Sequence, residues 1–228
     1  MTKQREQQIL DSWQRNAQPW VRALERGAIV SRVTATNRAI VAAIARLAPQ
    51  RVLDVGCGEG WLLRELAALG VAAEGVDAVP ELVATARAKG AANCHCLSYQ
   101  QLATHPWASR FDVAVCNFSL LGESLEGVLR VLAALLTPGG RVLVQTLHPC
   151  FTAGAQGYQR AWLEGSWQGM PGDLRAEFGD APPWYFRRLS DWLQLFAAAG
   201  FVVTAIDEPA AEVGGEPLSI IFELCLVQ

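Results

Sequence analysis

An apolar run that breaks into alternating glycines, at residues 52–60, places the strongest constraint on the fold. It reads Val-Leu-Asp-Val-Gly-Cys-Gly-Glu-Gly and is followed by a helical pattern over residues 61–69. Aliphatic residues cannot continue as a strand through glycine at every second position, so the backbone turns sharply there and enters a helix. Such a strand-turn-helix unit leaves bare backbone open to a small polar molecule.

The spacing of the glycines distinguishes two kinds of nucleotide-like cofactor. A dinucleotide site favours Gly-x-Gly-x-x-Gly, which would place its third glycine where this chain has Trp61. A bulky indole at that point of tight helix packing argues against a pyrophosphate at the helix N-terminus. The observed Asp-x-Gly-x-Gly-x-Gly, from Asp54 to Gly60, resembles instead the first motif of class I methyltransferases that use S-adenosylmethionine.

A second strand is expected over residues 71–76, and it ends in Asp77, seventeen residues after Gly60. A carboxylate at the tip of this strand is placed to accept hydrogen bonds from both ribose hydroxyls of an adenosine. Asp77 is therefore the expected ribose ligand. It also precedes a helix expected to begin at Pro80, so it can cap that helix, and the two roles can coexist.

Strands and helices alternate along the rest of the chain. Strands are expected at 93–97, 111–117 and 141–147, and helices at 80–89 and 125–136. This alternation predicts a parallel sheet with ligands at the carboxyl ends of its strands. After a helix at 189–199, strands at 201–206 and within 217–227 have no helix between them, so they should pair antiparallel. The expected fold class is α/β, a Rossmann-like doubly wound seven-stranded sheet with an antiparallel terminal strand.

The resemblance covers about residues 50–228 and is greatest to the small-molecule branch of the class I family. It extends to Phe111-Asp-Val-Ala, Leu136-Thr-Pro-Gly-Gly-Arg-Val-Leu-Val, Arg188-Leu-Ser-Asp-Trp and Ala199-Gly-Phe201. It implies S-adenosylmethionine as cofactor, S-adenosylhomocysteine as product, and transfer of a methyl group to oxygen, nitrogen or carbon of a small-molecule acceptor. The alternatives are a catalytically silent subunit that binds these cofactors and an NAD(P)-dependent oxidoreductase, which the glycine spacing and the antiparallel pair disfavour.

The resemblance and the chemistry of individual side chains together predict a set of cofactor-binding residues. They are Arg32, Asp54, Gly56, Cys57, Gly58, Gly60, Asp77, Ala78, Ser98, Tyr99, Asn117 and Phe118. Asp54 should hold the amino group of the methionine part or tie down the glycine turn, and backbone N–H groups of residues 56–60 should face the carboxylate. Asn117 should point toward the reacting methyl group, or be an ordinary turn residue. Many relatives carry an acidic residue for adenine where this chain has Ser98, a weaker acceptor, so stacking by Tyr99 can contribute.

The first part of the chain, residues 1–48, is expected to form a helical cap on a methyltransferase domain at 49–228. Apolar residues from Ile29 to Leu47 follow a helical period, so one or two helices should lie against the sheet or over the cofactor. Arg32 is the candidate partner of the cofactor carboxylate, because a guanidinium pairs bidentately with such a group. A solvated surface arginine is the alternative.

Residues 149–187 are expected to form an aromatic lid or substrate insertion. Its aromatic residues are Phe151, Tyr158, Trp162, Trp167, Phe178, Trp184, Tyr185 and Phe186. A loop of this length inside a domain is usually functional. The aromatic side chains suit an apolar or planar acceptor, or a cation, unless they form only a small core of their own.

Three residues are candidates for catalysis. His148 follows the fifth strand and precedes Pro149, which directs it out of the strand, and its neutral form is available as a general base near pH 7. Tyr158 and Tyr185 are candidates for orienting the acceptor. A purely structural histidine is the alternative, since transfer to a neutral amine needs no base.

Composition limits the classes of partner. A chain of 228 residues with 51% apolar residues can bury one substantial core, and a net charge of −3 without charge blocks argues against nucleic acid. The six cysteines form no Cys-x-x-Cys pair, so no metal site is expected and a reducing cytoplasm is the simpler setting. The polar N-terminus argues against secretion, and no apolar run reaches spanning length. The oligomeric state is left open.

Overall fold

A seven-stranded sheet forms the centre of the computed structural model, which describes residues 2–153 and 157–227. The strands are β1 (Arg51–Val55), β2 (Ala72–Asp77), β3 (Cys94–Cys96), β4 (Phe111–Asn117), β5 (Leu136–Thr146), β8 (Phe201–Asp207) and β9 (Ile220–Leu226). Their order across the sheet is β3-β2-β1-β4-β5-β9-β8. Neighbouring strands from β3 to β5 are parallel, whereas β9 is antiparallel to both β5 and β8. The expected doubly wound fold with an antiparallel terminal strand is confirmed.

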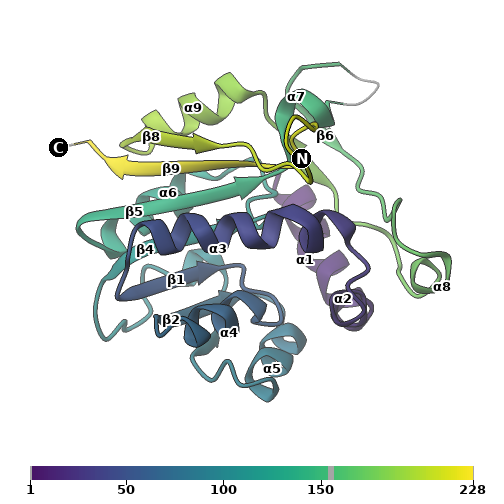
Figure 1. Cartoon of the computed structure of the whole chain (residues 1–228), viewed down its shortest axis with the longest axis horizontal. Coiled ribbons are helices and arrows are strands. Elements are labelled where there is room, and N and C mark those ends of the chain that lie inside the picture. The colour runs from purple at the N-terminus through teal and green to yellow at the C-terminus, as the bar shows by residue number, and fades with distance from the viewer. Residues whose placement is uncertain (1, 154–156, 228) are drawn as a thin grey trace.

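Helices cover both faces of this sheet (Figure 1). The helices that follow or precede its strands are α3 (Asn37–Arg46), α4 (Trp61–Ala68), α5 (Pro80–Ala88), α6 (Glu126–Leu135) and α9 (Leu189–Ala198). Helices α3 and α4 pack on one face, and α6 and α9 pack on the other. The ends of α4, α5, α6 and α9 differ from the expected ends by at most one residue. Within the described ranges, every helix is too short or too polar to span a bilayer.

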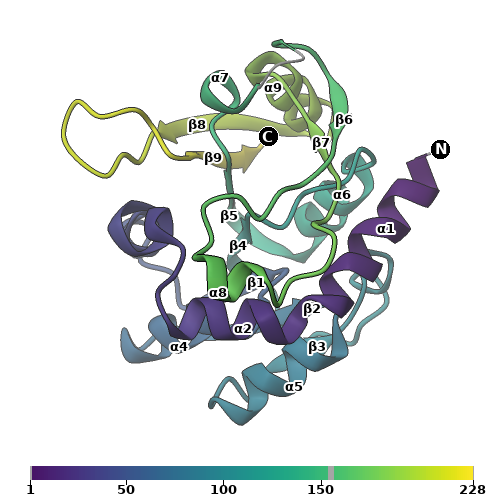
Figure 2. The same cartoon turned by 90° about the vertical axis from the view of Figure 1, so that its right-hand side faces the viewer.

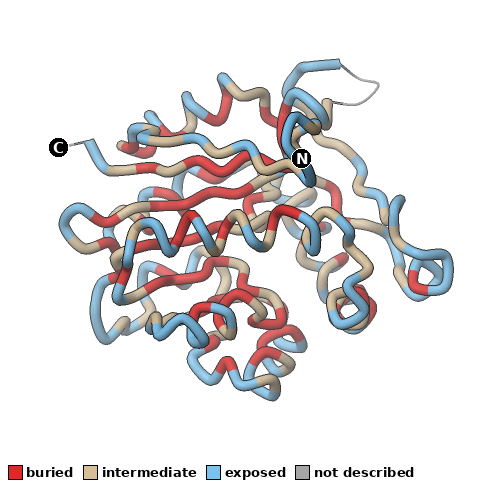
Figure 3. Tube along the Cα trace, in the orientation of Figure 1, coloured by how far each residue is buried: buried red, intermediate tan, exposed pale blue. Residues whose placement is uncertain are grey.

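The central strand β4 shows why an uninterrupted apolar run was a reliable strand signal. Val113 and Val115 pack toward α3 and α4, whereas Ala114 and Cys116 pack toward α6 and α9. Successive side chains of a strand point to opposite faces, so a strand covered on both sides must be apolar throughout. Figure 3 shows buried residues along the central strands, and each large aliphatic side chain buried there contributes about 1.5–3 kcal/mol.

The fifth strand is longer than expected. We expected it at 141–147, but β5 already begins at Leu136. Leu136 pairs with Phe111, and the register then shifts before Arg141 pairs with Val113. Gly139 and Gly140 lie within this irregular part of β5, because a bulge admits extra residues in one strand without ending its pairing with the neighbouring strand.

The N-terminal segment forms more helices than the one or two expected, and these helices pack in different places. Helices α1 (Thr2–Arg15) and α2 (Ala17–Glu25) are followed by a π-helical turn, η1 (Arg32–Thr36), which continues into α3. Ile40 and Ile44 of α3 are buried in the main core against the sheet. In Figure 1, α1 and α2 lie instead beyond the ends toward which β1 and β5 point. The division at residue 48 remains a prediction.

The aromatic insertion contains short elements that cross the same end of the sheet. They are α7 (Pro149–Thr152), β6 (Ala161–Leu163), α8 (Gly172–Arg175) and β7 (Trp184–Phe186). Strands β6 and β7 pair antiparallel, with Trp162 opposite Tyr185. Figure 2 shows the chain passing from β6 past α8, which lies beside α2, and back to β7. We refer to α1, α2 and residues 157–187 together as the cover.

A buried amide joins the two parts of the cover. Asn16 lies between α1 and α2 and is fully buried. Its Nδ2 donates to the carbonyl of Asp180 at 3.0 Å, and its Oδ1 accepts from the N–H of Gly179 at 2.8 Å. Ser12 donates to the same Asp180 carbonyl at 2.7 Å. Because each bond links residues far apart in the chain, the cover depends on tertiary contacts rather than on local propensity.

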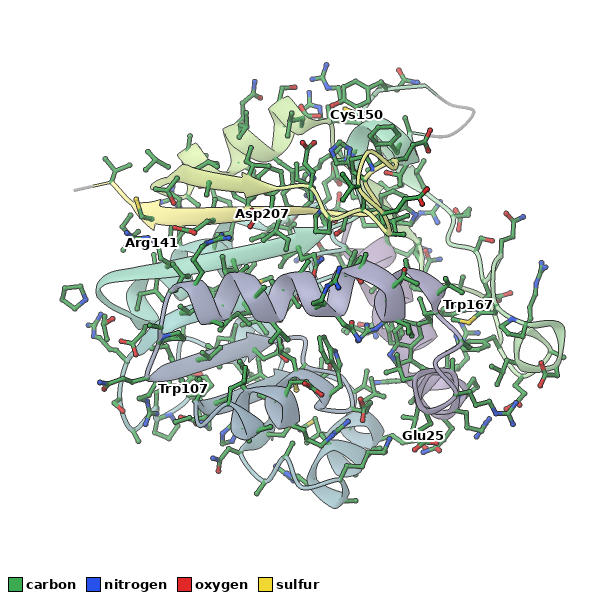
Figure 4. The ribbon with its side chains drawn as sticks, viewed as in Figure 1. Glu25, Trp107, Arg141, Cys150, Trp167 and Asp207 are labelled. Carbon is green, nitrogen blue, oxygen red and sulfur yellow. The ribbon has the colours of Figure 1, made fainter. Side chains whose placement is uncertain are left out.

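Aromatic contacts close the same junction. The ring of Trp167, labelled in Figure 4, lies 6.1 Å from the ring of Trp13 and 6.3 Å from that of Trp20. Its other neighbour is Phe178, at 4.3 Å. Aromatic pairs contribute about 0.5–1.5 kcal/mol beyond area burial, whereas exposed ion pairs such as Arg26–Asp173 contribute about 0–1 kcal/mol. The aromatic insertion is thus packed onto the N-terminal helices.

Candidate functional site

A cavity of about 1070 Å³ lies between the carboxyl ends of the strands and the cover. Its lining includes the ends of β1, β2 and β4, two residues of η1, and residues of α1, α2 and the insertion. Sites for one small ligand usually measure about 300–1,000 Å³. This cavity therefore has room for two small molecules side by side.

Most of the residues predicted for the site line this cavity. Those that line it are Arg32, Asp54, Gly56, Cys57, Gly58, Asp77, Ala78, Ser98, Tyr99, Asn117, Phe118 and Tyr185. Gly60, His148 and Tyr158 are absent from the lining. The structure thus brings the predicted cofactor residues together, while their individual roles remain predictions.

The glycine turn combines one close approach, at Gly56, with one open position, at Gly58. A Cβ on Gly56, whose φ is +83°, would lie 2.3 Å from the Cβ of Ser119. Gly58, with φ of +56°, has no heavy atom within 4 Å of a built Cβ. L-residues are strained at such positive φ values, so glycine permits the turn and leaves the side next to Gly58 open.

The loop N–H groups correct one expectation. Gly56 and Cys57 both donate to the carbonyl of Val76, at 2.8 and 2.9 Å. Gly58 donates to Asp77 Oδ2 at 2.9 Å, and Gly60 donates to the carbonyl of Cys57 at 3.0 Å. Four of the five N–H groups of residues 56–60 therefore stabilise the turn itself, and the expectation that they hold a ligand carboxylate is wrong for these four.

Gly60 serves packing in this structure. A Cβ on Gly60 would lie 2.9 Å from the Cβ atoms of Ala86 and Ala91. Ala86 belongs to α5, so the third glycine lets the turn approach the neighbouring helix. The close approach explains why Gly60 lies behind the cavity wall.

Five buried polar atoms in the cavity wall have no hydrogen-bond partner in the described chain. They are Arg32 Nε, Thr36 Oγ1, Asp54 Oδ1, Asn117 Oδ1 and Arg187 Nη1. Leaving one such group unsatisfied costs about 1–3 kcal/mol, so native proteins rarely tolerate several together. Their presence around one cavity indicates a polar ligand that carries both donors and acceptors.

Asp54 lies next to the last residue of β1 and is 2% exposed. Burial raises the pKa of Asp54 to about 7; nearby Asp77 raises it too, and Arg32 opposes the shift. A bound cationic group would favour the ionised carboxylate. Asp54 is therefore suited to bind an ammonium group.

Arg32 is held over aromatic rings at the edge of the cavity. Its guanidinium carbon lies 4.9 Å from the ring centroid of Trp61 and 6.0 Å from that of Trp20. Burial lowers the pKa of Arg32 to about 10, and Glu59 and Asp54 counteract this shift. The side chain stays cationic at neutral pH. Because its guanidinium lies against two aromatic rings, it is not the solvated surface arginine that was the alternative.

Asp77 does not cap α5, whose N-cap residue is Val79, but it holds the chain that enters this helix, and its ribose role remains a prediction. Its Oδ1 accepts from the N–H of Val79 at 2.9 Å, next to the start of α5, and Oδ2 accepts from Gly58. Burial raises the pKa of Asp77, and the two backbone hydrogen bonds lower it. Each carboxylate oxygen has a second lone pair, so Asp77 can still accept hydrogen bonds from a ligand.

Ser98 and Tyr99 stand at the other end of this wall, where β3 leads into the short helix η2 (Tyr99–Gln101). The Ser98 hydroxyl donates to Gln101 Oε1 at 3.0 Å, so its lone pairs are left to accept from a ligand. Tyr99 donates to the carbonyl of Ser119 at 2.8 Å, and burial raises the pKa of Tyr99. Tyr99 is therefore a neutral ring that joins the loops after β3 and β4.

The end of β4 carries backbone strain. Phe118 has a φ of +54°, a value that L-residues rarely adopt, and its N–H donates to the carbonyl of Gln145 at 2.8 Å. Such strain costs about 1–3 kcal/mol and persists where surrounding structure requires it, often at functional sites. It lies directly after Asn117, whose Oδ1 is one of the unpartnered atoms.

His148 and Tyr158 are occupied outside the cavity. His148 is 4% exposed, its Nε2 is 2.7 Å from Glu208 Oε1, and its Nδ1 accepts from the N–H of Cys150. The Tyr158 hydroxyl accepts from the N–H of Leu189 at 2.8 Å, at the start of α9. The structure does not bring either residue to the acceptor side, so their catalytic roles remain predictions that this geometry disfavours.

Several site residues were missed by sequence reasoning. Trp61 was used only to exclude a dinucleotide, although it supports Arg32. Thr36 had no local signal, because its burial follows from the π-helical turn. The burial of Arg187 follows from the path of the insertion. An arginine beside two aromatic residues, Tyr185 and Phe186, was the available hint for Arg187.

The fold and the cavity define an α/β protein that binds a nucleotide-like cofactor at the carboxyl ends of its strands. The chain belongs to the family described as "Methyltransferase domain", which matches residues 29–206. The expected family is therefore confirmed.

Curated relatives and solved structures support this membership. The ubiquinone biosynthesis O-methyltransferase of Xanthomonas oryzae pv. oryzae (strain PXO99A) is 36% identical over 112 residues, which are 45% of each chain. The match thus spans less than half of that relative. An S-adenosylmethionine-dependent methyltransferase from Mesorhizobium loti has a TM-score of 0.60 at 23% identity, covering 80% of this chain and 95% of that one. The 1,6-didemethyltoxoflavin-N1-methyltransferase of Burkholderia thailandensis, solved with its substrate and S-adenosylhomocysteine, has a TM-score of 0.64 at 18% identity, covering 94% and 88%. At these identities the two structures show the shared fold.

Proposed function

We propose that this protein is an S-adenosylmethionine-dependent methyltransferase that acts on a small-molecule acceptor. The observation that carries the proposal is the set of unpartnered buried atoms around one cavity in a member of this family. Structural neighbours solved with bound S-adenosylmethionine or S-adenosylhomocysteine support the choice of cofactor.

The chain offers a matching group for each polar part of the cofactor. Asp54 and Asn117 present oxygens for the amino group, and Arg32 presents a cation for the carboxylate. Asp77 presents a carboxylate for the ribose hydroxyls, and Ser98 an acceptor for the adenine amino group. When bound, S-adenosylmethionine supplies an electrophilic methyl group, which bonds to an acceptor lone pair while the carbon–sulfur electron pair stays on sulfur.

The protein's own contribution would be alignment and exclusion of water. The cover closes the cavity above the strand ends, and orientation can supply about 7–11 kcal/mol of a barrier. Burial raises the pKa of Tyr185, and its hydrogen bond to Glu123 raises it too, so the hydroxyl stays protonated at neutral pH and keeps its lone pairs to accept a hydrogen bond from a bound molecule. A proton lost from an oxygen or nitrogen acceptor would pass to water, since no histidine of the described chain lines the cavity.

The acceptor and the methylated atom are not carried over from the relatives, because the curated match spans only 45% of the chain. Oxygen is the first atom to test, given that those relatives are named O-methyltransferases. The cytoplasmic setting and the absence of a nucleic-acid partner also remain predictions.

Calorimetric titration with S-adenosylhomocysteine and separately with NADH tests the cofactor. We expect saturable binding of the first and none of the second, and the reverse result would favour an oxidoreductase. Incubation with methyl-labelled donor and a metabolite extract then tests turnover. Clear cofactor affinity with no labelled product would favour a silent binding subunit.

A further inference from the structure

A second buried cation lies in the cavity wall, on the side away from the adenosine residues. Arg187 follows β7, is 5% exposed, and lines the cavity. Its Nη2 donates to the carbonyls of Gly122 and Glu123, at 2.8 and 2.7 Å. Those carbonyls belong to the loop after β4, whereas Asp77 ends β2, on the far side of β1 in the sheet. Arg187 therefore faces a part of the cavity that the cofactor residues do not account for.

The guanidinium is positioned rigidly. Its central carbon lies 4.9 Å from the ring centroid of Tyr185 and 5.1 Å from that of Trp192. Both rings also line the cavity. Two carbonyls and two rings leave the side chain little rotational freedom, which reduces the entropy lost when it binds a partner.

Arg187 forms no ion pair with a carboxylate of the described chain, and its buried Nη1 has no hydrogen-bond partner there. Glu123 and Asp191 lie near enough to raise its pKa, but both are bonded to other residues. Glu123 accepts from Thr2, Trp162 and Tyr185, and Asp191 accepts from Arg188. Burial lowers the pKa of Arg187 to about 10, so it remains cationic at neutral pH.

A buried cation with an unused N–H group is destabilising unless an anion joins it. The neighbouring rings favour a planar partner. We propose that Arg187 binds a carboxylate on the acceptor, and that the acceptor is a small, planar, carboxylate-bearing molecule. This inference rests on the proposed function for the meaning of "acceptor", but the anion preference is measurable without turnover.

Matched acids and amides test the proposal on the whole protein. The probes are 3,4-dihydroxybenzoate, 4-hydroxyphenylacetate and 4-aminobenzoate, each paired with its primary amide. Binding is measured by calorimetry with and without saturating S-adenosylhomocysteine. We expect at least one acid to bind about tenfold or more tightly than its amide, as a charge-assisted hydrogen bond implies.

Three variants assign the preference to this side chain. Arg187→Met keeps most of the stem and should remove the difference between acid and amide, while Arg187→Lys should keep part of it. Arg130→Met is the matched control, because Arg130 is exposed, pairs with Glu126, and is absent from the cavity lining. It should leave the preference unchanged.

The outcomes separate the two proposals. Equal affinity of every acid and amide for the wild-type protein, no binding of any acid, or a preference that persists in Arg187→Met would overturn the anion site. Failure of S-adenosylhomocysteine to bind the wild-type protein would instead overturn the proposed function. Should Arg187→Met not fold, as judged by its near-ultraviolet circular dichroism, the wild-type comparison and Arg187→Lys decide the matter.

Discussion

The glycine turn and the cover face the same cavity, but neighbouring residues build the first and distant segments build the second. The turn is closed by hydrogen bonds among residues 55–79, at the ends of β1 and β2. The cover joins α1 and α2 to residues more than 140 positions later, through Asn16 and a cluster of tryptophans. We call the cavity wall at the ends of β1 and β2, where the methyl donor is expected, the donor wall. We infer that the donor wall is preformed, whereas the part of the cavity under the cover, where the acceptor is expected, depends on long-range packing.

The largest expected effect tests the donor wall. Asp77→Ala should weaken S-adenosylhomocysteine binding by about a hundredfold or more, because two charge-assisted hydrogen bonds to the ribose and two that hold the turn are lost. Calorimetry measures the change. Asp112→Ala is a matched control, since Asp112 also accepts two backbone N–H groups, from Gln50 and Arg51, at the other end of β1. Equal losses in the two variants would contradict a specific role for Asp77.

A smaller effect should appear as pH dependence at Asp54. With a pKa of about 7 and binding that requires the carboxylate, the Kd for S-adenosylhomocysteine should rise about tenfold between pH 8 and pH 6. Asp54→Asn should bind more weakly and lose most of that dependence. A wild-type Kd that stays constant over this range would remove Asp54 from the recognition of the amino group.

The same carboxyl makes a prediction about stability. Its folded pKa lies above the unfolded value of about 3.9, so between about pH 4 and pH 7 the folded protein keeps a proton that the unfolded chain has lost. The contribution of Asp54 to stability should therefore fall as pH rises through this window. Asp54→Asn should lack this contribution, as compared by urea unfolding at pH 5 and pH 8.

The cover should respond to Asn16 while the donor wall does not. Asn16→Ala removes the hydrogen bonds to Gly179 and Asp180 and should lower the free energy of unfolding by about 1–3 kcal/mol. Hydrogen exchange in residues 157–187 should become faster, with S-adenosylhomocysteine affinity nearly unchanged. Gln7→Ala is the control on the same helix, because among the described residues the Gln7 side chain bonds to Asp11 alone, at the surface. A parallel loss of cofactor affinity would show that the two regions are coupled.

The smallest effect is expected at His148. Because its nitrogens contact Glu208 and Cys150 outside the cavity, His148→Gln should change kcat by less than about threefold with an acceptor found in the extract screen. The pH profile of kcat measures this directly. A tenfold loss with intact cofactor affinity would restore the general base predicted from the sequence.

Particular residues show how far sequence reasoning reached. The run from Val52 to Gly60 predicted a strand followed by a turn, because an aliphatic run favours a strand and alternating glycines end it. Asp77 was recognisable since its distance from that turn places it at the neighbouring strand tip. The loop N–H groups were misjudged, because a motif does not reveal which donors the turn itself uses.

Local chemistry in the chain determined the alternating strands and helices, the antiparallel end of the sheet and the wall of cofactor residues, since each depends on patterns a few residues long. Only the tertiary structure decided that Arg187 is buried without an ion pair, that His148 turns to Glu208, and that Asn16 joins the cover. Burial and hydrogen bonding of those side chains depend on segments distant in the sequence. No local pattern records which distant groups will meet.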